Sequence, residues 1–496
     1  MTEALVDQQE TKLVRALGPL DATTIVMGSM IGSGIFITSA ESARLIGAPG
    51  WLLLAWAVAG LMTITGALCC SELATMMPRA GGVYIFLREA YGPSIGFLFG
   101  WTLFLVIQTG TIAAVAVAFA KFLGVFVSAI APDRYLVSPV SLGGGYAISL
   151  STEQLVAIAL IFLLTWTNTR GLRLGKLVQN TFTFAKTAAL AAVIIIGLSL
   201  GWNVNSAARS AAWWDSWANG WSPQIAQPGF TIAGALALVL LFGKAMVGPL
   251  FAQTAWTNVT FLGSEVRDPG RNLVRALLYG CGIVVLLYLL ANVAYCAVLP
   301  FSEIQHAPQN RVAVSVMKAV FGNPGAMCMA AAIMISTFGC DNGLILAGAR
   351  VYYAMARDRL FFQRVASTNR NHVPAAALIA QGIWAAFLTL PRTVTFKSGA
   401  AVYGNVYTQL LEYIISADLV FYLLMVVALI VLRNKSPDAT RPYRTWGYPL
   451  VPCVSIFLAA LLIIDLAYLA PATSGIGILI VLTGIPVYLA WRKRTG

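Results

Sequence analysis

The chain has 496 residues, of which 59% are hydrophobic and only 10% are charged, and its formal net charge is +13. Soluble globular domains carry roughly 25% charged residues. This composition excludes a soluble enzyme or binding module and indicates an integral membrane protein in contact with the lipid bilayer.

A bilayer is crossed by about 20 apolar residues, and this length divides the chain into twelve predicted membrane helices. In chain order they cover residues 21–46, 50–77, 95–130, 154–169, 177–201, 229–263, 273–299, 324–356, 373–391, 406–433, 448–470 and 473–492. The polar segment 1–20 lacks the basic start and cleavage site of a signal peptide. We therefore predict an all-α fold with a single membrane transport domain over residues 1–496.

The distribution of Lys and Arg over the loops predicts the orientation. With the N-terminus in the cytoplasm, 22 of the 32 basic residues fall on the cytoplasmic side and eight on the other, while Lys186 and Lys244 lie within spans. This is the positive-inside bias of a cell membrane (plasma or inner membrane) protein. We expect both termini to be cytoplasmic, and the net charge does not indicate a nucleic-acid partner.

The first span contains an unusual stretch, "MGSMIGSGIF" at 27–36, in which glycines and serines alternate. The sixth span contains "VGPLFAQTAW" at 247–256, with a Gly-Pro pair followed by polar residues. Non-helical backbone at membrane depth is tolerated only inside protein or beside a water-filled cavity. Interrupted spans at matching places of two halves are the best sequence indication of a transporter's binding site.

Five spans separate these two interruptions, so we predict two repeats, with helices 1–5 at 21–201 and helices 6–10 at 229–433. Because five is an odd number, the second repeat is inverted relative to the first. Helices 11 and 12, at 448–492, are additional.

Helix ends supply the chemistry expected at the two breaks. Where the first span resumes after Gly32-Ser33-Gly34, free N–H groups and a positive dipole end favour a carboxylate. Where the first half of span 6 ends near Phe251-Ala252-Gln253, free carbonyls favour an ammonium group. The two together predict a site for the zwitterionic part of an α-amino acid.

The motifs at these breaks resemble those of the amino acid–polyamine–organocation (APC) superfamily of secondary transporters, and most closely the bacterial relatives of L-type amino acid transporter light chains. The resemblance covers nearly the whole chain and is carried by five segments in order. They are "IGSGIF" (31–36), "SELATMMPRAGGVYIFLREAYGP" (71–93), "FAQTAW" with "EVRDPGRNL" (251–273), "STFGCDNG" with "ARVYYAMARD" (336–358) and "RPYRTWGYPLVP" (441–452).

The resemblance implies a LeuT-type 5+5 inverted repeat with helices 1 and 6 unwound at mid-membrane, and it implies the residues of the site. Phe251 would be the gate, and residues 253–255 depart from the family, where an aromatic residue and small glycines are commoner. The predicted substrate-binding residues are Met30, Gly32, Ser33, Gly34, Phe251, Ala252, Gln253, Thr254, Trp256, Asp341 and Asn342.

Lys186 lies within the predicted fifth span, where a lysine needs a partner or a cavity. In sodium-independent members of the family a lysine from this helix occupies the sodium place, so the resemblance implies that its ammonium group ties span 5 to the carbonyls around Gly28 and Ser29. Lys186 could also be a proton site, because buried lysines shift their pKa readily. The alternative is a lysine that reaches the headgroups.

We expect a sodium-independent carrier of neutral L-amino acids that works by exchange or by proton-coupled uptake. The alternatives are a cationic amino acid or polyamine carrier, for which only Asp341 and Glu412 supply acids, and a membrane sensor that binds an amino acid without transport. No catalytic grouping, metal site or cofactor is expected. The related light chains join a heavy chain through a cysteine between spans 3 and 4; that loop contains none here, so no disulfide-linked partner is expected.

Overall fold

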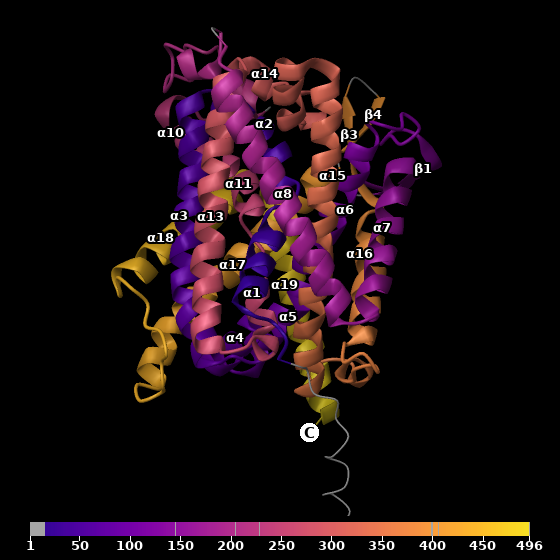
Figure 1. Cartoon of the computed structure of the whole chain (residues 1–496), viewed down its shortest axis with the longest axis vertical. Helices are drawn as coiled ribbons and strands as arrows, with labels where there is room; N and C mark the ends of the chain where they lie inside the picture. The colour runs from indigo at the N-terminus through magenta and orange to yellow at the C-terminus, as the bar shows by residue number, and fades with distance from the viewer. Residues whose placement is uncertain are drawn as a thin grey trace, which may run out of the picture.

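The computed structural model describes residues 15–495 apart from 144, 204, 228, 398, 399 and 405, so segment 1–14 of the predicted cytoplasmic N-terminus lies outside the described residues. Helices account for most of the described chain (Figure 1). In the first half they are α1 (Pro19–Met30), α2 (Gly34–Ile46), α3 (Pro49–Met76), α4 (Val83–Tyr91), α5 (Pro93–Thr102), the π-helical turn η1 (Leu103–Ile107), α6 (Gln108–Leu123), α7 (Thr152–Thr169), α8 (Leu172–Leu200), η2 (Ala207–Arg209), α9 (Pro223–Ala226), α10 (Gly234–Ala245) and α11 (Val247–Ala252). In the second half they are α12 (Asn258–Phe261), η3 (Gly263–Glu265), α13 (Pro269–Val298), α14 (Phe301–Gln305), η4 (Pro308–Asn310), α15 (Val312–Arg357), η5 (Gln363–Ala366), α16 (Ala375–Leu388), α17 (Val406–Lys435), α18 (Leu450–Leu469) and α19 (Pro471–Thr495).

Ten segments of the described chain are long and apolar enough to cross a membrane, which confirms a multi-pass helical membrane protein. The other two predicted spans correspond to α7 and the shorter α16, which pack against each other and against α6 and α15. The count of twelve spans stays a prediction. The predicted third span is too long, because its helix ends at Leu123 and residues 124–130 form turns.

The predicted eighth span, 324–356, corresponds to the part of α15 that follows a bend, while α15 as a whole starts at Val312. This helix is interrupted at Gly322, whose φ of 68° lies in the left-handed region, two residues before Pro324. Glycine adopts that conformation without the steric penalty of a side chain. The bend separates a short leading segment from the apolar part that the sequence predicts.

A small antiparallel sheet is added to the predicted all-α fold. It joins strands from two distant loops, β1 (Tyr135–Gly143) and β2 (Tyr146–Ser151) before α7, and β3 (Pro391–Lys397) and β4 (Ala400–Tyr403) after α16, in the order β1-β2-β3-β4. The sheet and α14 lie at one end of the bundle, which we call the sheet end, and α4 lies at the opposite end, the α4 end (Figure 1).

The two interrupted segments run in opposite directions through the bundle. Leu17, just before α1, pairs with Val266 beyond α12, so α1 starts where the other segment finishes. At the far end of α2, the Ile46 carbonyl accepts a hydrogen bond of 2.5 Å from Ser216 Oγ in the loop that precedes α10. Helices α3 and α13, which follow the two segments, pack against each other. The C-terminus also lies at the α4 end (Figure 1).

Buried ion pairs hold the loops at the α4 end. Arg350 of α15 donates from Nε to Glu265 Oε1 at 2.9 Å, and the two side chains are 0% and 1% exposed. The Glu265 carbonyl also accepts the N–H groups of Ala16 and Leu17, each at 3.0 Å. Residue 265 therefore anchors both α15 and the start of α1.

We predict that Glu265→Ala strongly destabilises the protein, because it leaves the Arg350 guanidinium buried without its carboxylate. Breaking a buried pair in this way costs about 3–5 kcal/mol of the free energy of unfolding. The matched control is Glu89→Ala, which removes the ion pair between Glu89 and Arg88. The Glu89 side chain is 43% exposed, and the loss of such a surface pair costs at most about 1 kcal/mol of the free energy of unfolding. Thermal unfolding in detergent measures both, and equal losses in the two variants would contradict the prediction.

Candidate functional site

The end of α1 lies deep in the bundle and leaves carbonyl groups without helical partners. Lys186 of α8 is fully buried, and its Nζ donates a hydrogen bond of 2.5 Å to the Gly28 carbonyl. A Cβ at Gly28 would lie 1.9 Å from Gln179 Nε2 and 2.4 Å from Thr183 Oγ1, so these side chains would have to move to admit it. The structure therefore places the Lys186 ammonium where the resemblance implies it, against the first break.

The neighbouring carbonyls of this break accept hydrogen bonds from two other helices, α13 and α15. The donors and acceptors are Cys340 Sγ to Ser29 at 3.2 Å, Tyr288 Oη to Met30 at 2.8 Å, and Ser336 Oγ to Ile31 and Gly32 at 3.2 and 3.3 Å. Side chains from three helices thus satisfy the broken end of α1. Its carbonyl groups therefore have partners inside the bundle.

The second break follows α11, which ends at Ala252. The Phe251 carbonyl accepts two hydrogen bonds from Thr254, from its N–H at 3.2 Å and from its hydroxyl at 2.9 Å. Ala255 adopts a φ of 66°, in the left-handed region that disfavours side chains. Glycine adopts this conformation without the steric penalty that the alanine side chain carries.

The two breaks are in direct contact. A Cβ added to Gly34, the first residue of α2, would lie 2.6 Å from Ala252 Cβ and 2.7 Å from its Cα. Glycine at 34 is therefore required for α2 to begin against the end of α11. The first N–H groups of α2, which have no acceptor within the helix, lie beside the carbonyl end of α11. Phe251, the predicted gate, is 6% exposed at this junction.

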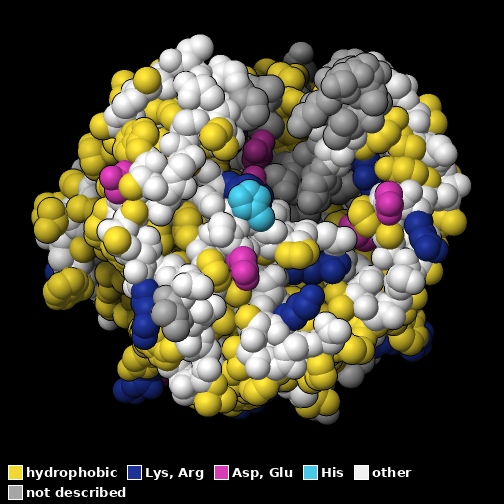
Figure 2. All heavy atoms as spheres, turned by 90° about the horizontal axis from the view of Figure 1, so that it is seen from above, with side chains coloured by type: hydrophobic (Ala, Val, Ile, Leu, Met, Phe, Trp, Pro, Cys, Tyr) yellow, Lys and Arg dark blue, Asp and Glu magenta, His cyan; other side chains and the backbone are white. Residues whose placement is uncertain are grey.

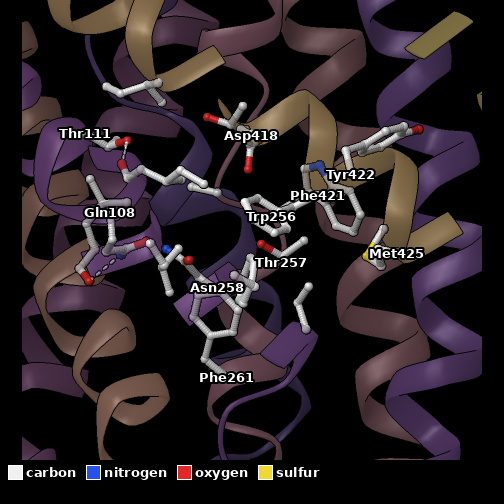
Figure 3. Close-up of a pocket in the computed structure, with 18 residues that line it drawn as sticks. Gln108, Thr111, Trp256, Thr257, Asn258, Phe261, Asp418, Phe421, Tyr422 and Met425 are labelled. Carbon is white, nitrogen blue, oxygen red and sulfur yellow. Dashed lines mark hydrogen bonds between the residues drawn. The ribbon is translucent and has the colours of Figure 1, made fainter. Parts of the chain in front are cut away.

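A cavity adjoins the second break (Figure 3), and the centres of water-sized molecules can occupy about 50 Å³ of it. Its wall is formed by α5, η1 and α6, by the segment from Thr254 to Phe261, by Leu344 of α15 and by α17, and it reaches Val83 at the start of α4. A smaller adjoining cavity shares Thr254, Trp256, Asp418 and Tyr422 with it. The wall combines aromatic rings with a few polar side chains, as small-molecule sites do.

The structure brings most of the predicted site residues together. Residues 30–34 form the first break, residues 251–254 form the second, and Trp256 lines both cavities. Gln253 lines the smaller cavity.

Asp341 and Asn342 do not belong to this group. Asn342 bonds to Asn168 Nδ2 at 2.9 Å and to the Gly175 carbonyl at 3.2 Å, so it faces α7 and the start of α8. Asp341 is fully buried, and neither of its oxygens has a hydrogen-bond partner among the described residues. Both residues lie outside the walls of the two cavities.

Several cavity residues were not predicted from the sequence. They are Gln108 and Thr111 of α6, Asn258 of α12, and Asp418 and Tyr422 of α17. Asp418 lies in the apolar run "YIISADLVFYLL" at 413–424, and an acid within a span is itself a reason to suspect a functional role. The acid within an apolar span was therefore a signal by which Asp418 could have been predicted.

The face at the sheet end is hollowed near its middle, with acidic and basic side chains at the hollow (Figure 2). A separate small pocket lies between α2, α10 and α17 and is lined by Glu41, Lys244 and Glu412. Lys244 Nζ donates to Gln227 Oε1 at 3.0 Å. Lys244 therefore forms part of a pocket wall, where it bonds to a neutral amide and lies with two glutamates.

Comparison with known proteins identifies relatives over the whole length of this chain. A family model described as "Amino acid permease" matches residues 17–489. The chain is 30% identical over 495 residues to the large neutral amino acids transporter small subunit 2 of Homo sapiens, covering 97% of this chain and 82% of the relative. It is 27% identical over 494 residues to the serine/threonine exchanger SteT of Bacillus subtilis, covering 98% and 99%. It is 29% identical over 497 residues to the b(0,+)-type amino acid transporter 1 of Mus musculus, covering 98% and 91%.

These relatives are transporters and exchangers of amino acids, and none of their names describes an enzyme. The matches confirm the family resemblance that the five motifs indicated, and with it the prediction of an amino acid transporter without enzymatic activity. The chain belongs to the amino acid permease family of the APC superfamily.

Proposed function

We propose that this transporter carries neutral L-amino acids independently of sodium, by exchange or by proton-coupled uptake with alternating access. The observation that carries the proposal is the hydrogen bond of 2.5 Å from Lys186 Nζ to the Gly28 carbonyl. An ammonium group at this position provides a fixed positive charge where a bound cation would otherwise be needed. The carbonyl groups at the end of α1 then face a positive charge without a sodium ion.

The substrate site in this proposal is the junction of the two breaks. The N–H groups from Gly32 to Gly34 would hold the α-carboxylate, as helix N-termini hold anions. The Gly32 N–H donates to the Met30 carbonyl at 2.8 Å, so it would exchange this bond for the carboxylate. The Met30 and Phe251 carbonyls, proposed acceptors for the amino group, already accept hydrogen bonds from Tyr288 and Thr254. Each oxygen already accepts two hydrogen bonds, because Met30 also accepts the Gly32 N–H and Phe251 accepts both the N–H and the hydroxyl of Thr254. A carbonyl oxygen has two lone pairs, so the amino group would replace one of these bonds.

The proposed architecture is the LeuT-type inverted repeat, with residues 21–201 and 229–433 as the two repeats and 448–492 as additional helices. The opposite directions of α1–α2 and α10–α12, and the packing of α3 on α13, support it. Phe251 would close the site by moving with α11.

We place the protein in the cell membrane with its α4 end in the cytoplasm, because most Lys and Arg residues lie in the predicted cytoplasmic loops and basic loops stay on the cytoplasmic side. The human relative is named a small subunit, which implies a larger partner for that protein. The loop 124–151 between α6 and α7 contains no cysteine. We therefore propose that this carrier works without a disulfide-linked heavy chain.

Two alternatives follow from specific features. A cationic amino acid or polyamine carrier needs an acid in the cavity; Asp341 lies outside the cavity walls, but Asp418 belongs to them. A sensor that binds an amino acid without moving it would have the same site. The alternatives are separated by measuring transport as well as binding.

Purified chain, reconstituted alone into sodium-free liposomes, is predicted to take up radiolabelled alanine or leucine. Uptake that requires amino acid inside the liposomes would identify an exchanger, and uptake driven by an inward proton gradient alone would identify a symporter. Binding without uptake under either condition would identify a sensor. A strict requirement for sodium would contradict the proposal, and activity that appears only with a second protein would contradict the unpartnered carrier.

Lys186→Ala is predicted to lower uptake about tenfold or more, because a hydrogen bond to a charged group contributes about 1.5–3 kcal/mol and each 1.4 kcal/mol is a factor of ten. Lys244→Ala is the control, since the Lys244 Nζ donates to Gln227 Oε1 in a separate pocket that it lines together with Glu41 and Glu412, and it should retain most of the uptake. If sodium restores uptake in Lys186→Ala, the ammonium acts as a substitute for the ion. Unchanged uptake in this variant would contradict the proposed role.

A further inference from the structure

A separate cavity at the sheet end lies between the loop 205–222, which includes η2 and α9 and leads towards α10, and helix α14, which Figure 1 shows at that end. The centres of water-sized molecules can occupy about 430 Å³ of it, compared with about 50 Å³ beside the second break. The proposed function uses none of its lining residues. Its polar lining includes Asn205, Ser206, Arg209 and Asn219 of the loop, and Ser302 and Gln305 of α14.

The lining of this cavity carries a positive charge without a counter-ion. Arg209 is the charged residue of the lining, and it forms no hydrogen bond or ion pair with another described residue. The acids closest in sequence to the two walls lie outside the lining: Asp215 accepts the Ala218 N–H at 3.0 Å, and Glu303 is exposed. A guanidinium group with no acid beside it favours an anionic ligand.

A buried hydroxyl group in the same wall also lacks a partner. Ser206 is 3% exposed, and its Oγ has no hydrogen-bond partner in the described part of the chain. Buried polar groups nearly always have partners. Asn205 adds an amide from the loop and Ser302 adds a hydroxyl from α14. A phosphate group has several strong acceptor oxygens, so it can accept hydrogen bonds from both walls at once.

Both walls of the cavity hold the end of α2. From the loop, Trp221 donates from Nε1 to the Leu45 carbonyl at 3.0 Å. From α14, Gln305 donates from Nε2 to the Ala43 carbonyl at 3.1 Å. The other end of α2 is Gly34, at the junction of the two breaks. A ligand that ties the two walls together would therefore restrain the helix that leads to the junction.

We propose that this cavity binds a phosphate group and that the bound anion slows transport by restraining α2. The Arg209 guanidinium pairs with the phosphate, and the Ser206 hydroxyl donates to it. The phosphate can be free or part of a lipid headgroup, because Trp202, which follows the end of α8, is 56% exposed and such tryptophans lie at headgroup level. The inference goes beyond the proposed function, since it assigns a second site that the amino acid does not occupy.

Binding is tested first, in detergent, by the melting temperature in sodium phosphate and in sodium chloride of equal ionic strength and pH. Phosphate should raise the melting temperature of wild-type protein above its value in chloride, and Arg209→Gln should weaken the apparent affinity for phosphate about tenfold or more. Arg134→Gln is the matched control, because Arg134 is an exposed arginine of another loop at the sheet end, outside this lining. It should respond to phosphate as wild type does.

A second arm identifies the source of the phosphate. The same three proteins are melted in micelles that contain either phosphatidylglycerol or diacylglycerol, which lacks the phosphate. An increase that needs both phosphatidylglycerol and Arg209, without a response to inorganic phosphate, assigns the site to a lipid headgroup. A response to inorganic phosphate that needs Arg209 assigns it to the free anion. If neither probe stabilises wild-type protein, or if Arg209→Gln responds as wild type does, the inference is wrong.

Transport tests the link to α2. The phosphate source identified by melting should lower the maximum rate of alanine uptake into liposomes about twofold or more in wild type and Arg134→Gln, with an unchanged KM, and should have no effect on Arg209→Gln. An unchanged rate in wild type would overturn the proposed restraint, and a raised KM with an unchanged maximum rate would mean that the anion competes for the substrate site. Failure of all alanine uptake by wild type would refute the proposed function, whereas the melting experiments would still decide the binding.

Discussion

Helix α1 ends inside the bundle, and the carbonyl groups at its end must find donors that an unbroken helix would have supplied. Each of the carbonyls from Gly28 to Gly32 accepts a hydrogen bond from a side chain of α8, α13 or α15. The contribution of Lys186 differs from the others because it brings a positive charge. Three helices are thereby oriented around one short stretch of backbone, and the break is a fixed part of the fold.

This arrangement explains why the two breaks and the cavity occur together. α2 begins against the end of α11, since Gly34 leaves room for Ala252, and the chain beyond Ala252 opens into the cavity wall. An amino group that enters the junction meets carbonyls that already have donors from Tyr288 and Thr254. Binding would therefore exchange one set of hydrogen bonds for another, which is a physical means of coupling substrate to the positions of α1 and α11.

Much of the fold was predictable from the sequence, because apolar length determines spans and because glycine, proline and polar residues within a span mark a break. For Lys186, its place within a span indicated only that it needs a partner or a cavity, and the contact with the Gly28 carbonyl was implied by the family resemblance. The sheet was not, because β2 and β3 pair across more than 200 residues of intervening chain, and loop sequences do not encode so distant a partner. Asp341 was expected near the substrate, but α15 is surrounded by other helices, and the sequence alone does not determine which side of such a helix faces a cavity.

A structure with an amino acid bound tests the central claim most directly, since that claim is that the junction of the two breaks is the substrate site. The account predicts the α-carboxylate within hydrogen-bond distance of the N–H groups at Ser33 and Gly34, with Lys186 still bonded to the Gly28 carbonyl. It also predicts the substrate side chain in the cavity beside Trp256. An amino acid bound elsewhere, or a sodium ion at the position of the Lys186 ammonium, would contradict it.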